Sequence, residues 1–177
     1  MPSLRGKDNS GASRPLVEKT AMQFPTVTGL NLHRKKVSLP QDLQGELNLV
    51  LIAFQQWQQT QVDTWIPFAR QLEETHPGVR YYELPTIQRL NILARTFINE
   101  GMRAGLPDPV VRARTITLYL DKDEFRQALQ LPHGDDIYVL LLDRQGQVLW
   151  REEGAFTPEK GESLAEQVQK WQEDEAE

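Results

Sequence analysis

The stretch at residues 55–61, QQWQQTQ, is where this sequence places the side chains best suited to chemistry or binding. It follows an apolar run and leads into an amphipathic pattern, and α/β proteins commonly hold their ligands at such a strand end. The stretch offers Trp57, Thr60 and several glutamines, and the whole chain contains no cysteine. A carboxamide is uncharged near neutral pH and a poor nucleophile. Thiolate catalysis, disulfides and cysteine-bound metals are therefore excluded.

Other metal-ligating residue types do not gather in the sequence. Three histidines fall in three separate predicted loops: His33, His76 and His133. Three aspartates lie closer together but lack the alternating spacing of a calcium-binding loop: Asp135, Asp136 and Asp143. Turn formation and strand capping explain these aspartates better. We expect no metal site and no cofactor.

Composition favours one globular domain that does not bind nucleic acid. The 177 residues are 39% hydrophobic and 25% charged, and the formal net charge is −5. No stretch approaches the ~20 apolar residues that span a bilayer.

We expect a flexible tail over residues 1–22 and a single domain over 23–175. A bacterial cytoplasmic protein is the default expectation. The alternative is an organelle transit peptide, which the basic residues of the tail suggest and Asp8 and Glu18 weaken.

Two further features each have two interpretations. Trp57 is either an exposed interface anchor or a lid folded over the core. The basic run from His33 to Lys36 reads as a solubilising hairpin tip. Its alternative is a contact with an anionic partner or a membrane surface.

The apolar periodicity predicts alternating strands and helices around residues 55–61. A hairpin is expected over 27–39, and strands are expected over 47–54, 79–84 (closed by Pro85), 115–120, 137–142 and 147–153. Helices are expected over 61–76 (with Pro67 inside) and 88–105. Two further helices are expected to start at Asp121 and at Thr157, the latter with Pro158 at its first position. Buried strands that alternate with helices imply parallel pairing, and the closing hairpin adds antiparallel strands. The fold class is α/β, with a mixed central sheet flanked by helices and an N-terminal β-hairpin.

This order resembles the thioredoxin-like fold, in the version used by peroxiredoxins and alkyl hydroperoxide reductases. The similar opening segment is FPTVTGLNLHRKKVSLPQDLQGELNLVLIAF, and the similar closing hairpin is IYVLLLDRQGQVLWREEG. Phe54 and Pro67 match the two residues that frame the redox cysteines of that superfamily. The cysteine positions then fall on Gln59 and Val62, or on Gln58 and Gln61 after a one-residue slip. The resemblance thus implies a redoxin scaffold that cannot exchange thiols and disulfides.

A second hallmark of redoxins is also absent from the sequence. Members of the superfamily place a cis-proline just before the strand that matches residues 137–142. Here the matching residues are Asp135-Asp136-Ile137, and Pro132 lies too far upstream. The resemblance therefore implies that the surface for substrate main chain is remodelled as well.

The closing region has a narrower resemblance, to the mitochondrial ATP synthase assembly factors that escort the membrane subunit 6. The matching residues are Tyr138, Leu141, Asp143, Gly146, Val148, Trp150, Gly154 and Glu159. Val148 departs from the family pattern, which has isoleucine there. This resemblance implies a chaperone-like binding role without catalysis.

We therefore expect a redox-inactive protein that binds another protein of unknown identity. The expected contact residues are Trp57, Gln58, Gln61, Asp136 and Trp150. The alternative is an enzyme or small-ligand binder with a non-thiol polar site at the same loop. That site would consist of Gln59, Thr60 and Asp136.

Overall fold

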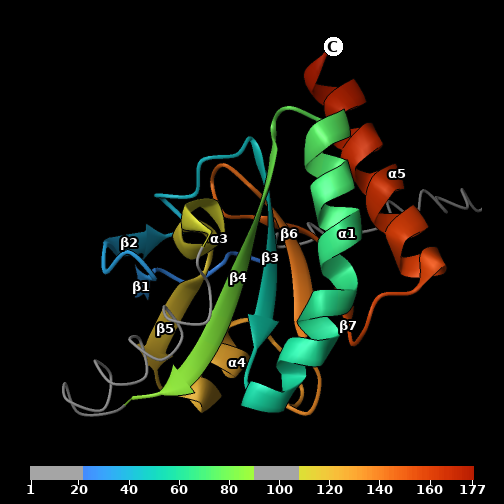
Figure 1. Cartoon of the computed structure of the whole chain (residues 1–177). Helices are drawn as coiled ribbons and strands as arrows, with labels where there is room; N and C mark the ends of the chain where they lie inside the picture. Colours follow the sequence, from blue (N-terminus) through green and yellow to red (C-terminus); the bar gives the residue numbers. More distant parts are fainter. Residues whose placement is uncertain (1–21, 90–107) are drawn as a thin grey trace, which may run out of the picture.

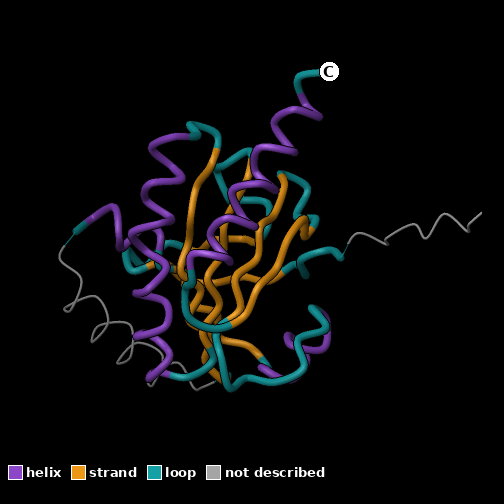
Figure 2. The backbone as a smooth tube through the Cα atoms, turned by 90° about the vertical axis from the view of Figure 1, so that its right-hand side faces the viewer, coloured by secondary structure: helices purple, strands orange, loops and turns teal. Residues whose placement is uncertain are grey.

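A seven-stranded mixed sheet forms the centre of the molecule in a computed structural model that describes residues 22–89 and 108–177 (Figures 1 and 2). Its strand order is β2-β1-β5-β4-β3-β6-β7. The strands are β1 (Val27–Asn31), β2 (Lys36–Leu39), β3 (Leu47–Ala53), β4 (Val79–Gln88), β5 (Ile116–Leu120), β6 (Tyr138–Asp143) and β7 (Val148–Glu153). The helices are the 3-10 helix η1 (Gln56–Gln58), α1 (Gln59–Thr75), α3 (Pro109–Arg114), α4 (Lys122–Ala128) and α5 (Pro158–Glu175).

Strand β3 lies inside the sheet, between β4 and β6, and is buried along its whole length. It pairs parallel with β4 on one side and antiparallel with β6 on the other. Alternate residues of β3 enter two separate apolar clusters, because successive side chains of a strand point to opposite faces. Helices α1 and α5 cover one face and α4 covers the other (Figure 1). The predicted mixed sheet flanked by helices is confirmed, and so is the N-terminal hairpin of β1 and β2.

Local capping signals fix two of the helix starts. The Asp121 carboxylate accepts hydrogen bonds from the first backbone N–H groups of α4, and the Thr157 hydroxyl accepts one from Lys160 N at the start of α5. Both caps are those that the sequence predicts, with Pro158 at the first position of α5. The turn that ends at Gly146 is also as predicted, and Gly146 adopts a φ of 81° there.

The structure corrects the predicted end of β4. Pro85 lies inside this strand and does not close it. It forms the last register pair with β3, at Ala53, and the ladder with β5 begins one residue later, at Thr86. A residue without an N–H fits where one ladder ends and the next begins. The helix predicted over 88–105 lies outside the described residues except at its start, where Gln88 is still strand. Most of the predicted tail also lies outside them.

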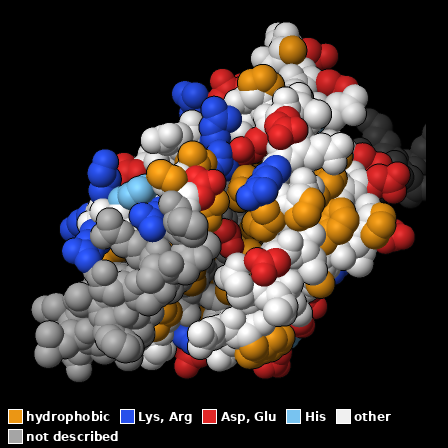
Figure 3. All heavy atoms as spheres, viewed as in Figure 1, with side chains coloured by type: hydrophobic (Ala, Val, Ile, Leu, Met, Phe, Trp, Pro, Cys, Tyr) orange, Lys and Arg blue, Asp and Glu red, His pale blue; other side chains and the backbone are white. Residues whose placement is uncertain are grey.

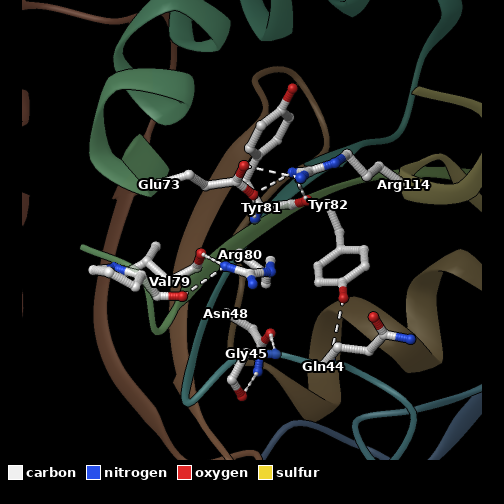
Figure 4. A network of polar contacts seen from close by, with 10 residues as sticks. Gln44, Gly45, Asn48, Glu73, Val79, Arg80, Tyr81, Tyr82 and Arg114 are labelled. Atoms are coloured by element: carbon white, nitrogen blue, oxygen red, sulfur yellow. Dashed lines mark hydrogen bonds and ion pairs between the residues drawn. The ribbon is translucent and has the colours of Figure 1, made fainter. Parts of the chain in front are cut away.

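Helix α3 is not predicted from the sequence, and a side-chain network holds it in place (Figure 4). Arg114, at the end of α3, forms a two-pronged ion pair with Glu73 of α1, in which Nη2 lies 2.9 Å from Oε2. Its guanidinium lies over the Tyr81 ring, 4.5 Å from the centroid. Burial by itself lowers the pKa of Arg114, but the hydrogen bond and charge of Glu73 outweigh it, and the net shift is upward. The network therefore connects α1, β4 and α3.

No helix among the described residues is long and apolar enough to cross a lipid bilayer.

Candidate functional site

The loop between β3 and α1 is built around a buried glutamine. Gln58 has no exposed surface, and its Oε1 accepts hydrogen bonds from Phe54 N (2.7 Å) and Gln55 N (3.2 Å). Its Nε2 donates to Gly134 O at 2.7 Å, across 76 residues of sequence. Gln58 therefore connects the end of β3 to the segment before β6. A side chain with no exposed surface contributes no contact area, so Gln58 supports the surface and is not part of it.

A lysine holds the same strand end from the other side. Lys122 Nζ, at the start of α4, donates to Phe54 O at 2.5 Å. Burial lowers the pKa of Lys122. The N–H and the C=O of Phe54 are thus both bound by side chains. These bonds fix the start of the loop at the end of β3.

Gln61 closes the gap between α1 and the segment before β6. Its Nε2 donates to Asp136 Oδ1 at 2.8 Å, and its Oε1 accepts from Ile137 N at 3.1 Å. The sequence predicts that Asp136 and Ile137 match the cis-proline segment of redoxins. The cis peptide bond that the described structure contains lies elsewhere, at Leu39-Pro40. The carboxamide of Gln61 therefore occupies the N–H of Ile137 and one carboxylate oxygen of Asp136.

Gln59 and Val62, the residues matched to redox cysteines, are the first and fourth residues of α1. Gln59 is exposed, whereas Val62 is only 1% exposed. Gln59 Nε2 donates to Asp63 Oδ1 at 2.9 Å and to Glu83 Oε1 at 3.0 Å. An uncharged donor shared by two carboxylates lowers their repulsion. The match to redox positions stays a prediction from the sequence.

Glu83 is the titratable group that sequence reasoning missed at this loop. Burial raises the pKa of its carboxyl, and the nearby charge of Asp63 raises it further. The hydrogen bond from Gln59 and the charge of Arg70 act in the opposite direction. Its one sequence signal is a charged residue inside the apolar strand pattern VRYYEL. Such a signal does not say which helix will cover the carboxyl.

Trp57 is the exposed aromatic residue of the loop. Its side chain is 57% exposed, so it is not the lid on the core that one interpretation expected. The Thr60 hydroxyl donates to Trp57 O at 3.1 Å and holds the backbone of η1 against the start of α1. The loop thus presents an indole on a backbone that is fixed from below by Gln58.

Trp150 lies away from this loop and has a different environment. It is partly buried, and its ring lies 6.2 Å from that of Trp65 in an edge-to-face arrangement. Its Nε1 donates to Ser163 Oγ of α5 at 3.0 Å. The structure therefore brings Trp57, Gln61 and Asp136 to one end of the sheet. It places Trp150 in the packing between β7 and α5.

The described residues contain no group of three or more His, Asp or Glu side chains that could hold a metal ion. Trp57 lines neither of two hollows on the described surface. One is lined by Gln44, Glu46, Pro77, Gly78, Arg80 and Arg144, and the other by Pro132, Tyr138, Arg151, Glu152 and Glu153. The exposed part of the loop therefore suits contact with a partner's surface better than enclosure of a small molecule.

The fold places the chain in the thioredoxin-like class. Similar solved structures include BsSco, a member of the Sco family of cytochrome c oxidase assembly proteins (15% identity, 84% of this chain and 93% of that one, TM-score 0.57). Yeast Sco1 is similar at 12% identity over 84% and 96% of the chains, with a TM-score of 0.57. The exposed lipoprotein thioredoxin Etrx1 of Streptococcus pneumoniae is similar at 11% identity over 82% and 99%, with a TM-score of 0.52.

The particular family is narrower than this class. The model of the family described as ATP10 protein matches residues 5–170, so the chain belongs to that family. This is the assembly-factor family that the closing region resembles. No curated protein matches the chain. The peroxiredoxin-like branch within the thioredoxin-like class stays a prediction.

Proposed function

We propose that this protein is a redox-inactive assembly factor that binds another protein through the surface around Trp57. The observation that carries the proposal is the 57% exposed indole on an internally fixed loop. Membership of the ATP10 family supports the assembly role. The absence of cysteine from the sequence supports redox inactivity.

An exposed tryptophan on a rigid support suits an interface anchor. Tryptophan is enriched among the residues that dominate binding energy. A loop already ordered by Gln58 and Lys122 loses little conformational entropy when a partner binds. Gln59 and Thr60 flank the indole with exposed polar groups, as expected at the rim of an interface.

Partner binding by addition of a β-strand is disfavoured, because one residue on each edge strand already has its main-chain groups occupied. On β2, Ser38 N donates to Asp42 Oδ2 at 2.7 Å, and Ser38 O accepts from Asp42 N at 2.8 Å. On β7, Glu153 N donates to Glu152 Oε1, and Glu153 O accepts from Lys160 Nζ at 2.5 Å. Such contacts protect edges from pairing with another chain. We therefore assign the contact to side chains at the strand end.

The family resemblance makes a membrane subunit of ATP synthase the first partner to test. The Sco protein in the comparison is described as a cytochrome c oxidase assembly protein, and the same fold can thus serve assembly of a membrane enzyme. Cytoplasmic and organelle locations both stay predictions.

The decisive experiment compares variants of Trp57 in a strain that lacks the native gene. We expect wild type to restore assembled ATP synthase on native gels and to co-purify a subunit of it. Trp57→Ala should lower co-purification by roughly 30-fold, a loss typical of an interface anchor. Gln56→Ala, an exposed neighbour, serves as the matched control, and Trp57→Phe should restore part of the binding. Equal recovery by Trp57→Ala and Gln56→Ala would remove the basis of the proposal.

A direct test of redox inactivity uses insulin reduction and peroxide consumption. Both should equal buffer, because no thiol is present. Activity above buffer in either assay contradicts the proposal.

One observation keeps the small-ligand alternative open to test, namely the carboxyl of Glu83 beside Gln59. If these groups bind a small polar molecule, a thermal-shift screen of metabolites and metals will show a stabilisation of several degrees. The same shift must then be absent from Glu83→Gln. A screen in which no compound raises the unfolding temperature favours the protein-binding function.

A further inference from the structure

A second surface of the molecule combines basic and apolar side chains from two elements that are distant in sequence. The turn between β1 and β2 carries Arg34 and Lys35, and Lys36 begins β2; all three are exposed. Helix α3 brings Arg112 beside this turn, together with Val110, which is 58% exposed. We call these five residues the basic tip. Lys and Arg side chains gather over the hairpin and α3 at the left of Figure 3.

Two contacts fix the hairpin turn against α3. Leu32 N donates to Arg112 O at 3.0 Å, and the side chain of Leu32 is buried. The imidazole Nε2 of His33 donates to Pro109 O at 2.8 Å. The two elements therefore present their side chains as one surface. They are distant in sequence, since 76 residues separate His33 from Pro109.

The turn itself is ordered by hydrogen bonds to one buried side chain. Asn31 is buried, and its Oδ1 accepts hydrogen bonds from His33 N (2.9 Å) and Lys35 N (3.0 Å). Arg34 adopts a φ of 62°, which reverses the chain at that residue. A turn ordered in this way holds its exposed cations close together before any ligand arrives.

The charge of the basic tip is opposite to that of the chain as a whole. The protein has a net charge of −5, whereas the basic tip holds four cations; among the described residues, the carboxylate of Asp108 lies next to it at the start of α3. A local positive region on an acidic protein attracts anionic surfaces in one orientation, with the rest of the molecule facing away. Arg114 is not part of this surface, because it is paired with Glu73.

We propose that the basic tip binds the anionic surface of a lipid membrane, with Val110 entering the headgroup region. Clustered lysines and arginines each add attraction to anionic lipids, and an exposed aliphatic side chain adds apolar burial at the interface. The basic tip contains no aromatic side chain on which a nucleic-acid base would stack, and this favours lipid over single-stranded nucleic acid. The inference is independent of the partner-binding surface at Trp57.

The test is sedimentation of the full chain with vesicles of phosphatidylglycerol and phosphatidylcholine. The wild type should bind these at low salt, remain free with pure phosphatidylcholine, and be released at 1 M salt, where the Debye length is about 3 Å. Lys35→Gln with Lys36→Gln should lower the partition constant about fivefold per cation, or roughly 25-fold for the pair. Val110→Gln should lower it severalfold without changing the salt dependence.

The matched control removes the same charge elsewhere. Arg144 and Lys170 are both exposed and lie outside the basic tip, so Arg144→Gln with Lys170→Gln should bind vesicles like wild type. Trp57→Ala should also bind like wild type, which separates this inference from the proposed function. The inference is overturned if wild type ignores anionic vesicles at low salt, or if both double variants lose binding equally. Tighter binding to an RNA oligomer than to vesicles at equal phosphate concentration also overturns it.

Discussion

The loop after β3 and the basic tip are both rich in polar side chains, but they use them in opposite ways. At the loop, the carboxamides of Gln58 and Gln61 form hydrogen bonds inside the molecule. Their partners are Gly134 O, Asp136 and Ile137 N. At the basic tip, Lys35 and Lys36 are exposed. The comparison teaches that polar composition alone does not distinguish an internal support from a contact surface. A polar side chain acts as an internal support when a polar group from a distant segment lies within hydrogen-bonding distance of it.

The substitution with the largest expected effect is Gln58→Ala at the loop. It leaves three main-chain groups without their partner: Phe54 N, which is buried, and Gln55 N and Gly134 O, which are partly buried. Each unsatisfied group costs about 1–3 kcal/mol, so we expect a loss of roughly 3 kcal/mol or more in the free energy of unfolding. Urea denaturation measures it.

Gln56→Ala is the control for this prediction. It removes the same type of side chain two residues before Gln58, at a position that is exposed. Its effect should lie within about 0.5 kcal/mol. Vesicle binding should be unchanged in both variants, since neither touches the basic tip. Equal stability of the two variants would mean that the loop does not depend on its buried carboxamide.

The second prediction weakens the support of the basic tip. Arg114→Met removes the cation that joins α3 to Glu73 and leaves a mostly buried carboxylate with one fewer partner. We expect a loss of about 2 kcal/mol in the free energy of unfolding, because breaking a shielded pair costs more than breaking an exposed one. A double-mutant cycle with Glu73→Gln measures the coupling between the two side chains.

Arg114→Met also sharpens the comparison between the two regions. The basic tip keeps all its cations in this variant, so any loss of vesicle binding reports the positioning of α3. We expect a loss smaller than that of the Lys35 and Lys36 double variant. Insulin reduction stays blank throughout. If the cycle shows no coupling, the ion pair does not hold α3 in place.

The sequence predicts those parts of the molecule that short-range rules determine. The apolar run of β3 indicates a strand buried on both faces, and Asp121 and Thr157 mark helix starts through bonds to residues two or three positions on. The exposure of Trp57 was one of two alternatives. The structure decides between them, because the η1 backbone turns the indole outward.

Long-range contacts explain what the sequence does not predict. Gln56 and Gln58 are the same residue type in the same loop. Gln58 binds the nearby Phe54 N and Gln55 N, and its bond to Gly134 O adds a contact 76 residues away that the sequence does not indicate. The six residues of α3 are too few to give a clear periodic pattern. Their placement depends on Glu73, 41 residues before Arg114. Pairings of this kind become visible only when the chain is folded.

The third prediction, with the smallest expected effect, concerns Glu83 at the loop. Burial raises the pKa of its carboxyl in the folded state above the value in the unfolded chain, and the charge of Asp63 adds to the shift. The folded protein therefore binds this proton more tightly than the unfolded chain. Stability contributed by the protonated form is present below the unfolded pKa and is lost as the pH rises through the folded pKa.

Glu83→Gln removes this titration and keeps a neutral side chain of similar size beside Gln59. It should stabilise the protein at neutral pH by a few tenths of a kcal/mol and leave the stability at low pH nearly unchanged. Denaturation across the acidic to neutral range measures the difference between the two proteins. Asp63→Asn, which removes the neighbouring charge, should give a weaker effect of the same sign. A destabilisation at neutral pH by Glu83→Gln would mean that the bond from Gln59 outweighs the burial of the charge, and that the loop depends on an ionised carboxylate after all.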